Sequence, residues 1–462
     1  MRKQTPTPNH FEQMTTAPVA GLIARLAVPS MISMLVSSIY NLADTYFVSQ
    51  IDNDAPAAVG VIFSLMAIIQ ALGFALGMGS GNYVSRLLGM KKDEEARRVV
   101  SVAFFTALLL GAGLSAAGLI NPHGLVSLLG ARPELRAYAA EYAVYILMAA
   151  PFMMCSFVMN NQLRAQGFAA HSMAGLTVGG VLNIVLDPIC IRFMGVGGAG
   201  LATMLSQIVS FLLLVALTMT ARGVIRIQIK KFRPTAEIYR QILHAGLPSF
   251  ARQGLISLSS VVLSFTAGGF GTAALAAMTI VNRVTMFIYS ALIGFAQGFQ
   301  PVCGFNWGAR RYDRVLAAYT FCLRVALLML GLLGVLFFIG APALLGLFRD
   351  DPEVLRIGVA ALRFQCASMP LQAYIVMGQF LTQSIGYGGR AAVIAMGRQG
   401  LFLIPNYLLL PLFMQITGIT SAQFFSDIFT FILTFFIMRG VLRDIRGKAA
   451  EEEQGGQEAT NA

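Results

Sequence analysis

The sequence predicts an all-α integral membrane protein. It has twelve transmembrane helices in two six-helix bundles, related by a pseudo-twofold axis along the membrane normal. Composition, twelve apolar runs and an internal repeat predict this fold. Of the 462 residues, 56% are hydrophobic and 12% are charged, whereas about 25% are charged in soluble domains. The net charge of +12 does not indicate nucleic-acid binding, because most Lys and Arg residues lie in short loops between apolar runs.

Twelve apolar runs reach the length of about 20 residues that a helix needs to cross a bilayer. They are residues 22–48, 57–88, 99–120, 137–160, 171–193, 196–221, 241–267, 272–305, 315–340, 357–380, 391–414 and 418–438. Of the 33 Lys and Arg residues, 23 lie on the side of both termini and 5 on the other side. The positive-inside rule then predicts a multi-pass protein of the cytoplasmic (inner) membrane with both termini in the cytoplasm.

The second half of the chain repeats the first with a constant shift in numbering. Seven landmarks coincide in register, and they include Pro29 with Pro248, Gly79 with Gly298, and Pro151 with Pro370. Each half holds six spans, an even number, so both halves enter the membrane in the same direction. We therefore expect a cytoplasmic N-terminal segment (1–20), a first lobe (21–221), a basic cytoplasmic linker (222–240), a second lobe (241–440) and a disordered cytoplasmic tail (441–462).

Two carboxylates, Asp44 and Asp187, lie inside apolar runs of the first half. An aspartate at the centre of a membrane helix costs about 2.5–3.5 kcal/mol. Each acid alone could be a structural residue near a helix end, hydrated by water on the outer side of the membrane. Two such acids with polar neighbours at the same depth favour a functional site instead.

The depth of these neighbours follows from a rise of about 1.5 Å per helical residue. It places Asp44, Tyr142, Asn183, Asp187 and Thr203 in one band, in the outer half of the first bundle. Such an oxygen-rich set can bind Na⁺ directly or hold a proton on a carboxyl group. We interpret it as a cation-coupling site and leave H⁺ and Na⁺ open.

Three further residues of the first lobe are assigned an auxiliary role. Tyr40 and Asn41 lie about one helical turn before Asp44, and Pro188 follows Asp187. Because proline removes a backbone donor, Pro188 frees a carbonyl group and allows a kink in the fifth span.

The second half lacks this set of residues. The shift that pairs Pro29 with Pro248 also maps Asp44 to Leu263 and Asp187 to Asn406, so the coupling acids are confined to the first lobe. The spans of the second lobe contain several arginines instead, with Asp427 as their expected counter-ion. We assign the following residues to structural ion pairs or to a substrate cavity: Arg252, Gln253, Arg283, Arg363, Arg398 and Asp427.

Other motifs exclude several classes of function. None of the five cysteines forms a CxxC pair and the four histidines are scattered, so we expect no metal site beyond possible Na⁺ at the coupling site, and no cofactor. A GxGxxG pattern at 195–200 joins two apolar runs rather than a strand and a helix, which excludes a dinucleotide site. The chain has no HExxH, GxSxG or Walker motif, which disfavours an enzyme.

These features together resemble the multidrug and toxic compound extrusion (MATE) family over roughly residues 15–445. The resemblance rests on Leu26-Ala27-Val28-Pro29, Asn41 to Asp44, Gly89, Tyr142 nine residues before Pro151, Asn183-xxx-Asp187-Pro188 and Gly200-Leu201-Ala202-Thr203. It implies two V-shaped lobes and export of amphipathic, often cationic compounds in exchange for H⁺ or Na⁺ by alternating access. The acids match the branch resembling DinF and MepA. A NorM-type ion site in the second lobe is not expected, because spans 7 and 10 hold no carboxylate.

The intramembrane arginines keep an alternative open. The chain could export anionic or zwitterionic metabolites, or flip a lipid-linked precursor. A membrane enzyme or a channel is disfavoured. As partners we expect small-molecule substrates and the lipid bilayer but no nucleic acid, and we expect a monomer.

Overall fold

The computed structural model describes residues 10–48, 50–51, 55–221, 223–348 and 351–461. These ranges are helical apart from short turns and contain no β-strand. Ten helices within these ranges are long and apolar enough to cross a membrane. One of them, α7 (Ala169–Thr220), reverses direction at Gly195 (φ 55°, ψ −132°) and so crosses twice. Helix α8 (Ala236–Gly268) is also long enough, although Arg252 and Gln253 lower its hydropathy. The predicted twelve crossings are confirmed.

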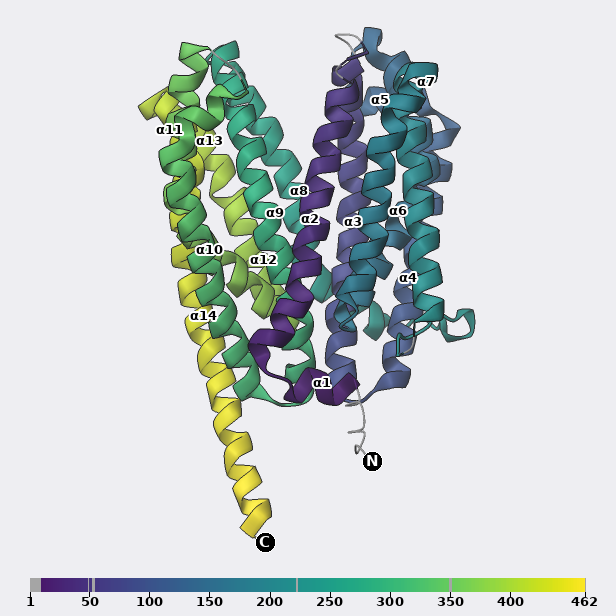
Figure 1. The fold of residues 1–462 in the computed structure, drawn as a ribbon, viewed down its shortest axis with the longest axis vertical. Helices are drawn as coiled ribbons and strands as arrows, with labels where there is room; N and C mark the ends of the chain where they lie inside the picture. The colour runs from purple at the N-terminus through teal and green to yellow at the C-terminus, as the bar shows by residue number, and fades with distance from the viewer. Residues whose placement is uncertain (1–9, 49, 52–54, 222, 349–350, 462) are drawn as a thin grey trace, which may run out of the picture.

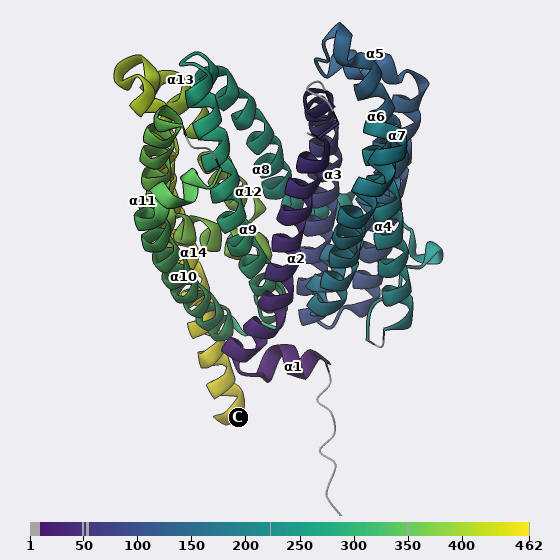
Figure 2. The ribbon, with the colours of Figure 1, turned by 45° about the horizontal axis from the view of Figure 1, so that its top comes forward.

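The helices form two lobes that lie apart at one end of the molecule and meet towards the other end, where α1 (His10–Thr16) and the C-terminal end of α14 (Ile416–Asn461) lie (Figures 1 and 2). The first lobe contains α2 (Val19–Val48), α3 (Ala55–Gly89), α4 (Asp93–Ile120), α5 (Pro122–Leu128), α6 (Arg136–Ala165) and α7. The second lobe contains α8, α9 (Thr272–Gly308), α10 (Tyr312–Gly346), α11 (Pro352–Ser384), α12 (Gly388–Met396), the π-turn η3 (Gly397–Leu401), α13 (Leu403–Met414) and α14 (Ile416–Asn461).

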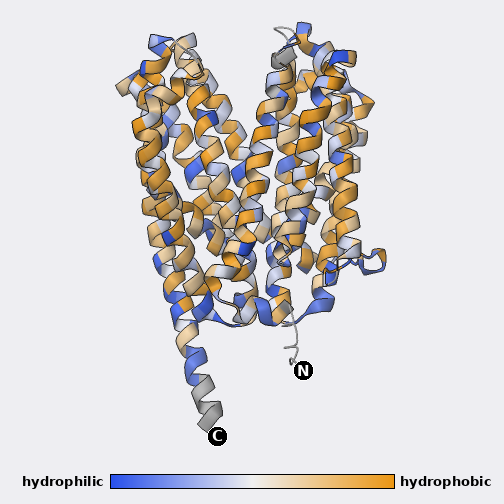
Figure 3. Ribbon diagram, viewed as in Figure 1, coloured by the Kyte–Doolittle hydropathy of each residue, from blue (hydrophilic) through white to orange (hydrophobic). Residues whose placement is uncertain are grey.

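Both lobes have many exposed large apolar residues, and most of their helical ribbon has the colours of hydrophobic residues in Figure 3. On α10, Leu328, Leu332 and Leu336 recur every four residues and are 67%, 72% and 64% exposed. An apolar stripe of this kind would be a liability in water but is suited to lipid. The outer surface therefore fits a membrane environment.

The lobes contact each other through helix pairs that the internal repeat relates. Helix α3 packs on α8, and α2 packs on α9. A Cβ added to Gly79 would lie 3.1 Å from the Gly246 Cα atom, and a Cβ on Gly298 would collide with the Ala27 backbone. Gly79 and Gly298 are the same position in the two repeats, as are Ala27 and Gly246. Small residues thus allow close helix approach at both equivalent crossings.

The N-terminal segment joins the two lobes at the end where they meet. Helix α1 (His10–Thr16) lies across this end (Figure 2). From the second lobe, Asn306 Nδ2 donates to the Met14 carbonyl oxygen at 3.2 Å, and Arg314 Nη2 donates to the Ala17 carbonyl oxygen at 2.6 Å. From the first lobe, the Lys91 ammonium lies 4.7 Å from the centre of the Phe11 ring. Residues 1–9 of the predicted segment lie outside the described residues.

The linker and the tail contain more regular structure than expected. In the linker, η2 (Ile229–Lys231) is a short 3₁₀ helix, and Lys231 forms an ion pair of 2.5 Å with Glu94 on α4. Helix α14 continues to Asn461, so the prediction of a disordered tail at 441–462 is wrong. The physical reason is composition, because Lys448 to Gln454 is rich in Ala, Glu, Lys and Gln, which have high helix propensity.

Candidate functional site

The two halves of α7 bring together Asn183, Asp187 and Thr203. Asn183 and Asp187 are one turn apart before the reversal at Gly195, and Thr203 follows the reversal. Asn183 Nδ2 donates to Asp187 Oδ1 at 3.2 Å and to Thr203 Oγ1 at 3.4 Å. All three side chains are buried, Asp187 completely. The Asn183 amide therefore fixes the carboxylate relative to the second half of the helix.

Asp44 on α2 lies close to this group. It is 5% exposed, and its charge acts on Asp187 as well as on the phenols of Tyr40 and Tyr142. Tyr142, on α6, is fully buried. Three helices thus bring to one place the five residues that the sequence singles out in the first lobe. Their role in ion coupling stays a prediction.

The auxiliary residues lie beside this group. Tyr40 and Asn41 line a cavity of about 120 Å³ in the first lobe, together with Asn183 and Thr203. The cavity therefore borders Asn183, the hydrogen-bond partner of Asp187, and Thr203, to which Asn183 also donates. Pro188 lies within regular helix, and the non-helical backbone of α7 occurs at Gly195 instead. Regular helix thus continues through Pro188, and Gly195 marks the turn between the two spans of α7.

Three buried carboxylate and amide oxygen atoms of this group accept no hydrogen bond from any described residue. They are Asp44 Oδ1, Asn183 Oδ1 and Asp187 Oδ2. Buried acceptors normally have partners, and an unpaired buried charge is costly. A proton on one carboxyl group would relieve this cost. A Na⁺ ion would do so too, because hard cations prefer carboxylate and carbonyl oxygens. Among the described residues, no group of three or more His, Cys, Asp or Glu could hold a metal ion.

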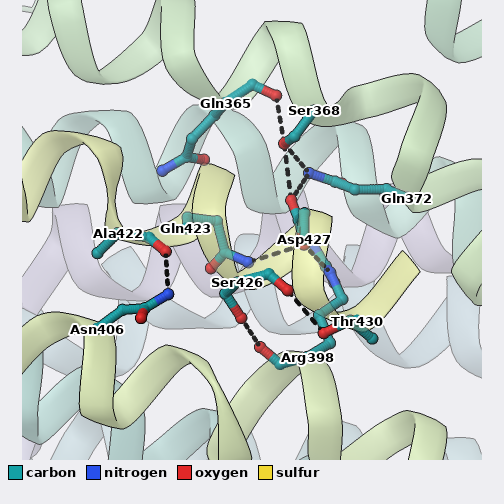
Figure 4. A network of polar contacts seen from close by, with 10 residues as sticks. All are labelled: Gln365, Ser368, Gln372, Arg398, Asn406, Ala422, Gln423, Ser426, Asp427 and Thr430. Atoms are coloured by element: carbon teal, nitrogen blue, oxygen red, sulfur yellow. Dashed lines mark hydrogen bonds and ion pairs between the residues drawn. The ribbon is translucent and has the colours of Figure 1, made fainter. Parts of the chain in front are cut away.

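Asp427 on α14 pairs with one of the four arginines that the sequence assigned to the second-lobe site. Its Oδ1 atom lies 3.0 Å from Arg398 Nε, and both residues are buried. Ser368, Gln372 and Gln423 also donate to the carboxylate (Figure 4). Three of these five residues were absent from the predicted site. They are uncharged, and nothing in the sequence distinguishes them from the other polar residues of the spans.

Arg283 and Arg252 form no ion pair with Asp427. Arg283 is exposed on α9 and lines a cavity of about 300 Å³ between the lobes. At the same cavity, Gln253 donates across the interface to Gln70 of the first lobe at 3.3 Å. Arg252 is 7% exposed, and its Nε atom has no acceptor among the described residues. The prediction of a shared counter-ion is therefore wrong for these two arginines.

The prediction is wrong for Arg363 as well. This residue is exposed, donates to the Phe338 carbonyl oxygen at 3.4 Å and lies over the Phe338 ring at 5.2 Å. The aliphatic part of the side chain can lie along apolar surface, and the face of the Phe338 ring attracts the guanidinium charge. The residue therefore needs no carboxylate partner. Arg363 thus takes part in neither the Asp427 pair nor the cavity between the lobes.

Arg164 on α6 is a buried cation that the sequence does not reveal. Its position in the sequence suggests a short basic loop, yet it is 3% exposed. Its guanidinium donates to the side-chain oxygens of Asn160 at 3.4 Å and Asn161 at 2.5 Å. No carboxylate in the described part of the chain pairs with it. The available signal was the Asn160-Asn161 pair, one helical turn before the arginine.

This architecture defines the class of the protein. Two repeated six-crossing lobes, a cavity between them and buried acids in one lobe are typical of a secondary transporter. The MatE family matches residues 29–189 and again residues 248–408. The two matches start at Pro29 and Pro248, which are paired landmarks of the internal repeat. The chain belongs to the MatE family of transporters, which confirms the resemblance seen in the sequence.

Individual relatives are similar over most of their length. Multidrug export protein MepA of Staphylococcus aureus is 27% identical over 413 residues, covering 89% of this chain and 90% of the relative. A multidrug resistance MATE family transporter solved in the outward-facing conformation superposes with a TM-score of 0.89 at 27% identity, covering 96% of this chain and 100% of that chain. A MOP superfamily transporter from Pyrococcus furiosus, whose reverse polarity of the binding pocket suggests a different function, gives a TM-score of 0.87 at 27% identity with the same coverage.

Proposed function

We propose that this protein is a multidrug efflux antiporter of the inner membrane. It exports amphipathic organic cations in exchange for H⁺ or Na⁺ by alternating access. The observation that carries the proposal is the pair of buried acids, Asp44 and Asp187, each with an unpaired oxygen atom in the first lobe. Neither a cofactor nor an enzymatic activity is part of this proposal.

Ion coupling follows from the different states of this site. With the site empty, two neighbouring carboxylates repel each other, and their unpaired oxygens favour entry of a cation. Protonation or Na⁺ binding removes this cost and changes how α2 packs against α7. A ligand shifts a conformational equilibrium only by its difference in affinity between the two states. The coupling ion therefore has to weaken drug binding, so that its entry releases the drug outward.

The cavity between the lobes supports the binding of amphipathic compounds. It is lined by side chains of both lobes, and its large apolar side chains are Leu42, Phe63, Met66, Met286 and Phe287. Methionine and aromatic side chains adapt to ligands of different shape. The MepA relatives are named multidrug export proteins, which agrees with such a site. The exposed Arg283 in this cavity is the observation that favours the alternative, an exporter of anionic or zwitterionic compounds.

The orientation of the transporter is also a proposal. Helix α1 and the C-terminal end of α14 lie at the end where the lobes meet (Figure 1), and the excess of Lys and Arg assigns that end to the cytoplasm. The separated ends of the lobes would then face outward. Export would require the lobes to separate at the cytoplasmic end in another conformation.

Efflux in everted membrane vesicles tests the proposal. We expect a cationic dye to accumulate inside the vesicles when their lumen is more acidic than the medium, or when their lumen contains more Na⁺ than the medium. The effective gradient identifies the coupling ion. Asp44→Asn and Asp187→Asn should abolish this accumulation, whereas Asp313→Asn, at an exposed position outside the site, should not. Wild-type rates in both site variants would refute the coupling role.

A further inference from the structure

The two lobes enclose cavities at the same position of the repeat. The first-lobe cavity of about 120 Å³ is lined by residues that include Tyr40, Asn41, Gly179 and Gly180. The second-lobe cavity of about 160 Å³ is lined by their counterparts in the second repeat, Ser259, Ser260, Arg398 and Gln399. The repeat has thus duplicated a cavity. Where the first lobe has Gly179, without a side chain, the second lobe has a guanidinium group.

The backbone that carries Arg398 is irregular. Residues Gly397–Leu401 form a π-turn between α12 and α13, and turns of this kind are frequent at functional sites. Ser426 donates to the Arg398 carbonyl oxygen at 3.0 Å, and Ser259 donates to the Gln399 carbonyl oxygen. These bonds fix the turn from two sides. Arg398 therefore has a defined position at the cavity wall.

The Asp427 carboxylate is fully occupied by donors. Its Oδ1 atom accepts from Arg398 and from Gln423 at 3.1 Å, and its Oδ2 atom accepts from Ser368 at 2.7 Å and Gln372 at 2.8 Å (Figure 4). A carboxylate has about four lone-pair sites. Asp427 thus has no capacity left for a ligand in the cavity, and it does not line the cavity.

Arg398, in contrast, has donor capacity left. Its Nε atom is used on Asp427, but its Nη1 atom has no hydrogen-bond partner in the described part of the protein. The residue is 8% exposed and lines the cavity. The Tyr289 ring, 4.4 Å from the guanidinium carbon, covers another side of the group. A buried donor on a charged group costs free energy when it has no acceptor, so binding of an acceptor at this atom is favourable.

The surrounding charge selects the kind of acceptor. Arg398 is the charged residue among those lining this cavity, and none of the lining residues is a carboxylate. Met286 lines both this cavity and the larger one between the lobes, where Arg283 is the charged lining residue. Asp427 balances the charge of Arg398, whereas Arg283 has no such partner in the described ranges. The local excess is positive and favours an anionic acceptor. The planar donor edge of a guanidinium fits a carboxylate.

We propose that the second-lobe cavity is a binding site for the carboxylate of amphipathic aromatic compounds, with Arg398 Nη1 as donor. The inference rests on the proposed export function for its transport readout and specifies the zwitterionic compounds of the alternative. With about 160 Å³, the cavity admits one end of a ligand, because whole drug-sized ligands fill about 300–1,000 Å³. The rest of the ligand extends past Met286 into the cavity of about 300 Å³ between the lobes.

The test compares two fluorescent dyes that differ in one group, a rhodamine with a free carboxyl group and its methyl ester. Binding to the purified full-length protein is followed by fluorescence anisotropy. Arg398→Lys keeps a cation near Asp427 but removes the Nη1 donor. We expect it to bind the carboxylate dye about tenfold or more weakly and to bind the ester as the wild type does. Equal effects on both dyes, or no effect on either, would overturn the proposal.

A second variant avoids the ion pair and keeps the test decisive if Arg398→Lys does not fold. Thr285 on α9 lines the cavity, whereas Thr279 on the same helix is exposed and does not line it. Thr285→Trp should fill the cavity and weaken carboxylate-dye binding by a similar factor, and Thr279→Trp should not. Equal binding in the two tryptophan variants would exclude this cavity as the site. Failure of coupled transport with intact selective binding would refute the proposed function alone.

Discussion

Gly89 and Gly308 lie face to face where the two lobes meet. A Cβ atom added to either glycine would come 3.0 Å from the Cα atom of the other. They occupy the same position in the two repeats, so the pseudo-twofold axis passes between them. Opening of the lobes at this end has to separate the two glycines.

Enlarging this contact should impair transport. Gly308→Val introduces a side chain against the Arg86 carbonyl oxygen and Gly89, and overpacking of this kind costs about 1–3 kcal/mol. We expect a slower efflux rate and a lower melting temperature in detergent. Gly331→Val is the matched control, since a Cβ there has no neighbour within 4 Å. An effect of Gly331→Val as large as that of Gly308→Val would contradict this interpretation.

Asp187→Asn should make the protein more stable while removing coupled transport. The carboxylate is completely buried and one of its oxygens has no donor. An amide keeps the shape without the charge, so we expect a gain of about 1–3 kcal/mol. Thermal unfolding in detergent measures the gain. Asn183→Leu, which removes the hydrogen bond to Asp187, should not be stabilising. A destabilised Asp187→Asn protein would show that the acid is structural.

Arg398→Leu should strongly destabilise the second lobe. It leaves Asp427 buried without its cation, and breaking a buried pair costs about 3–5 kcal/mol. The surface pair Arg390–Asp444, with both side chains more than 40% exposed, provides the comparison, since Arg390→Leu should cost about 1 kcal/mol or less. Chemical denaturation of both variants tests the difference. If the two variants have similar stability, the polar network around Asp427 does not depend on the arginine.

Loosening α1 should favour opening at the end where the lobes meet. Arg314→Ala removes the bond to the Ala17 carbonyl oxygen and the bond of 3.1 Å to Asn306 Oδ1. Spin labels at Lys92 and Asp313, one in each lobe and both exposed, would report the separation of the lobes. We expect a larger population of long distances than in the wild type. Arg311→Ala, at a neighbouring exposed position without an ion pair in the described ranges, is the control and should leave the distance distribution unchanged.

Much of the fold could be predicted because membrane helices are readable from local sequence. Apolar runs identify the spans, and a constant shift in numbering, seen in Pro29 with Pro248, pairs the lobes. The region from Lys448 was predicted to be disordered because of its polar composition. The prediction did not take into account that the same residues have high helix propensity. Burial of Arg164 was missed because charge alone does not show whether a loop residue packs inward.

The sequence by itself determined the class of protein, the twelve crossings, the repeat and the confinement of Asp44 and Asp187 to one lobe. Only the tertiary structure decided which arginine Asp427 pairs with, since Arg398 and Asp427 lie on different elements and meet through packing of η3 against α14. It also revealed that each lobe has a cavity at equivalent positions, with a glycine in one lining where the other has an arginine. The physical reason is that depth along a helix follows from the chain, whereas the partner of a side chain depends on how helices rotate and pack around it.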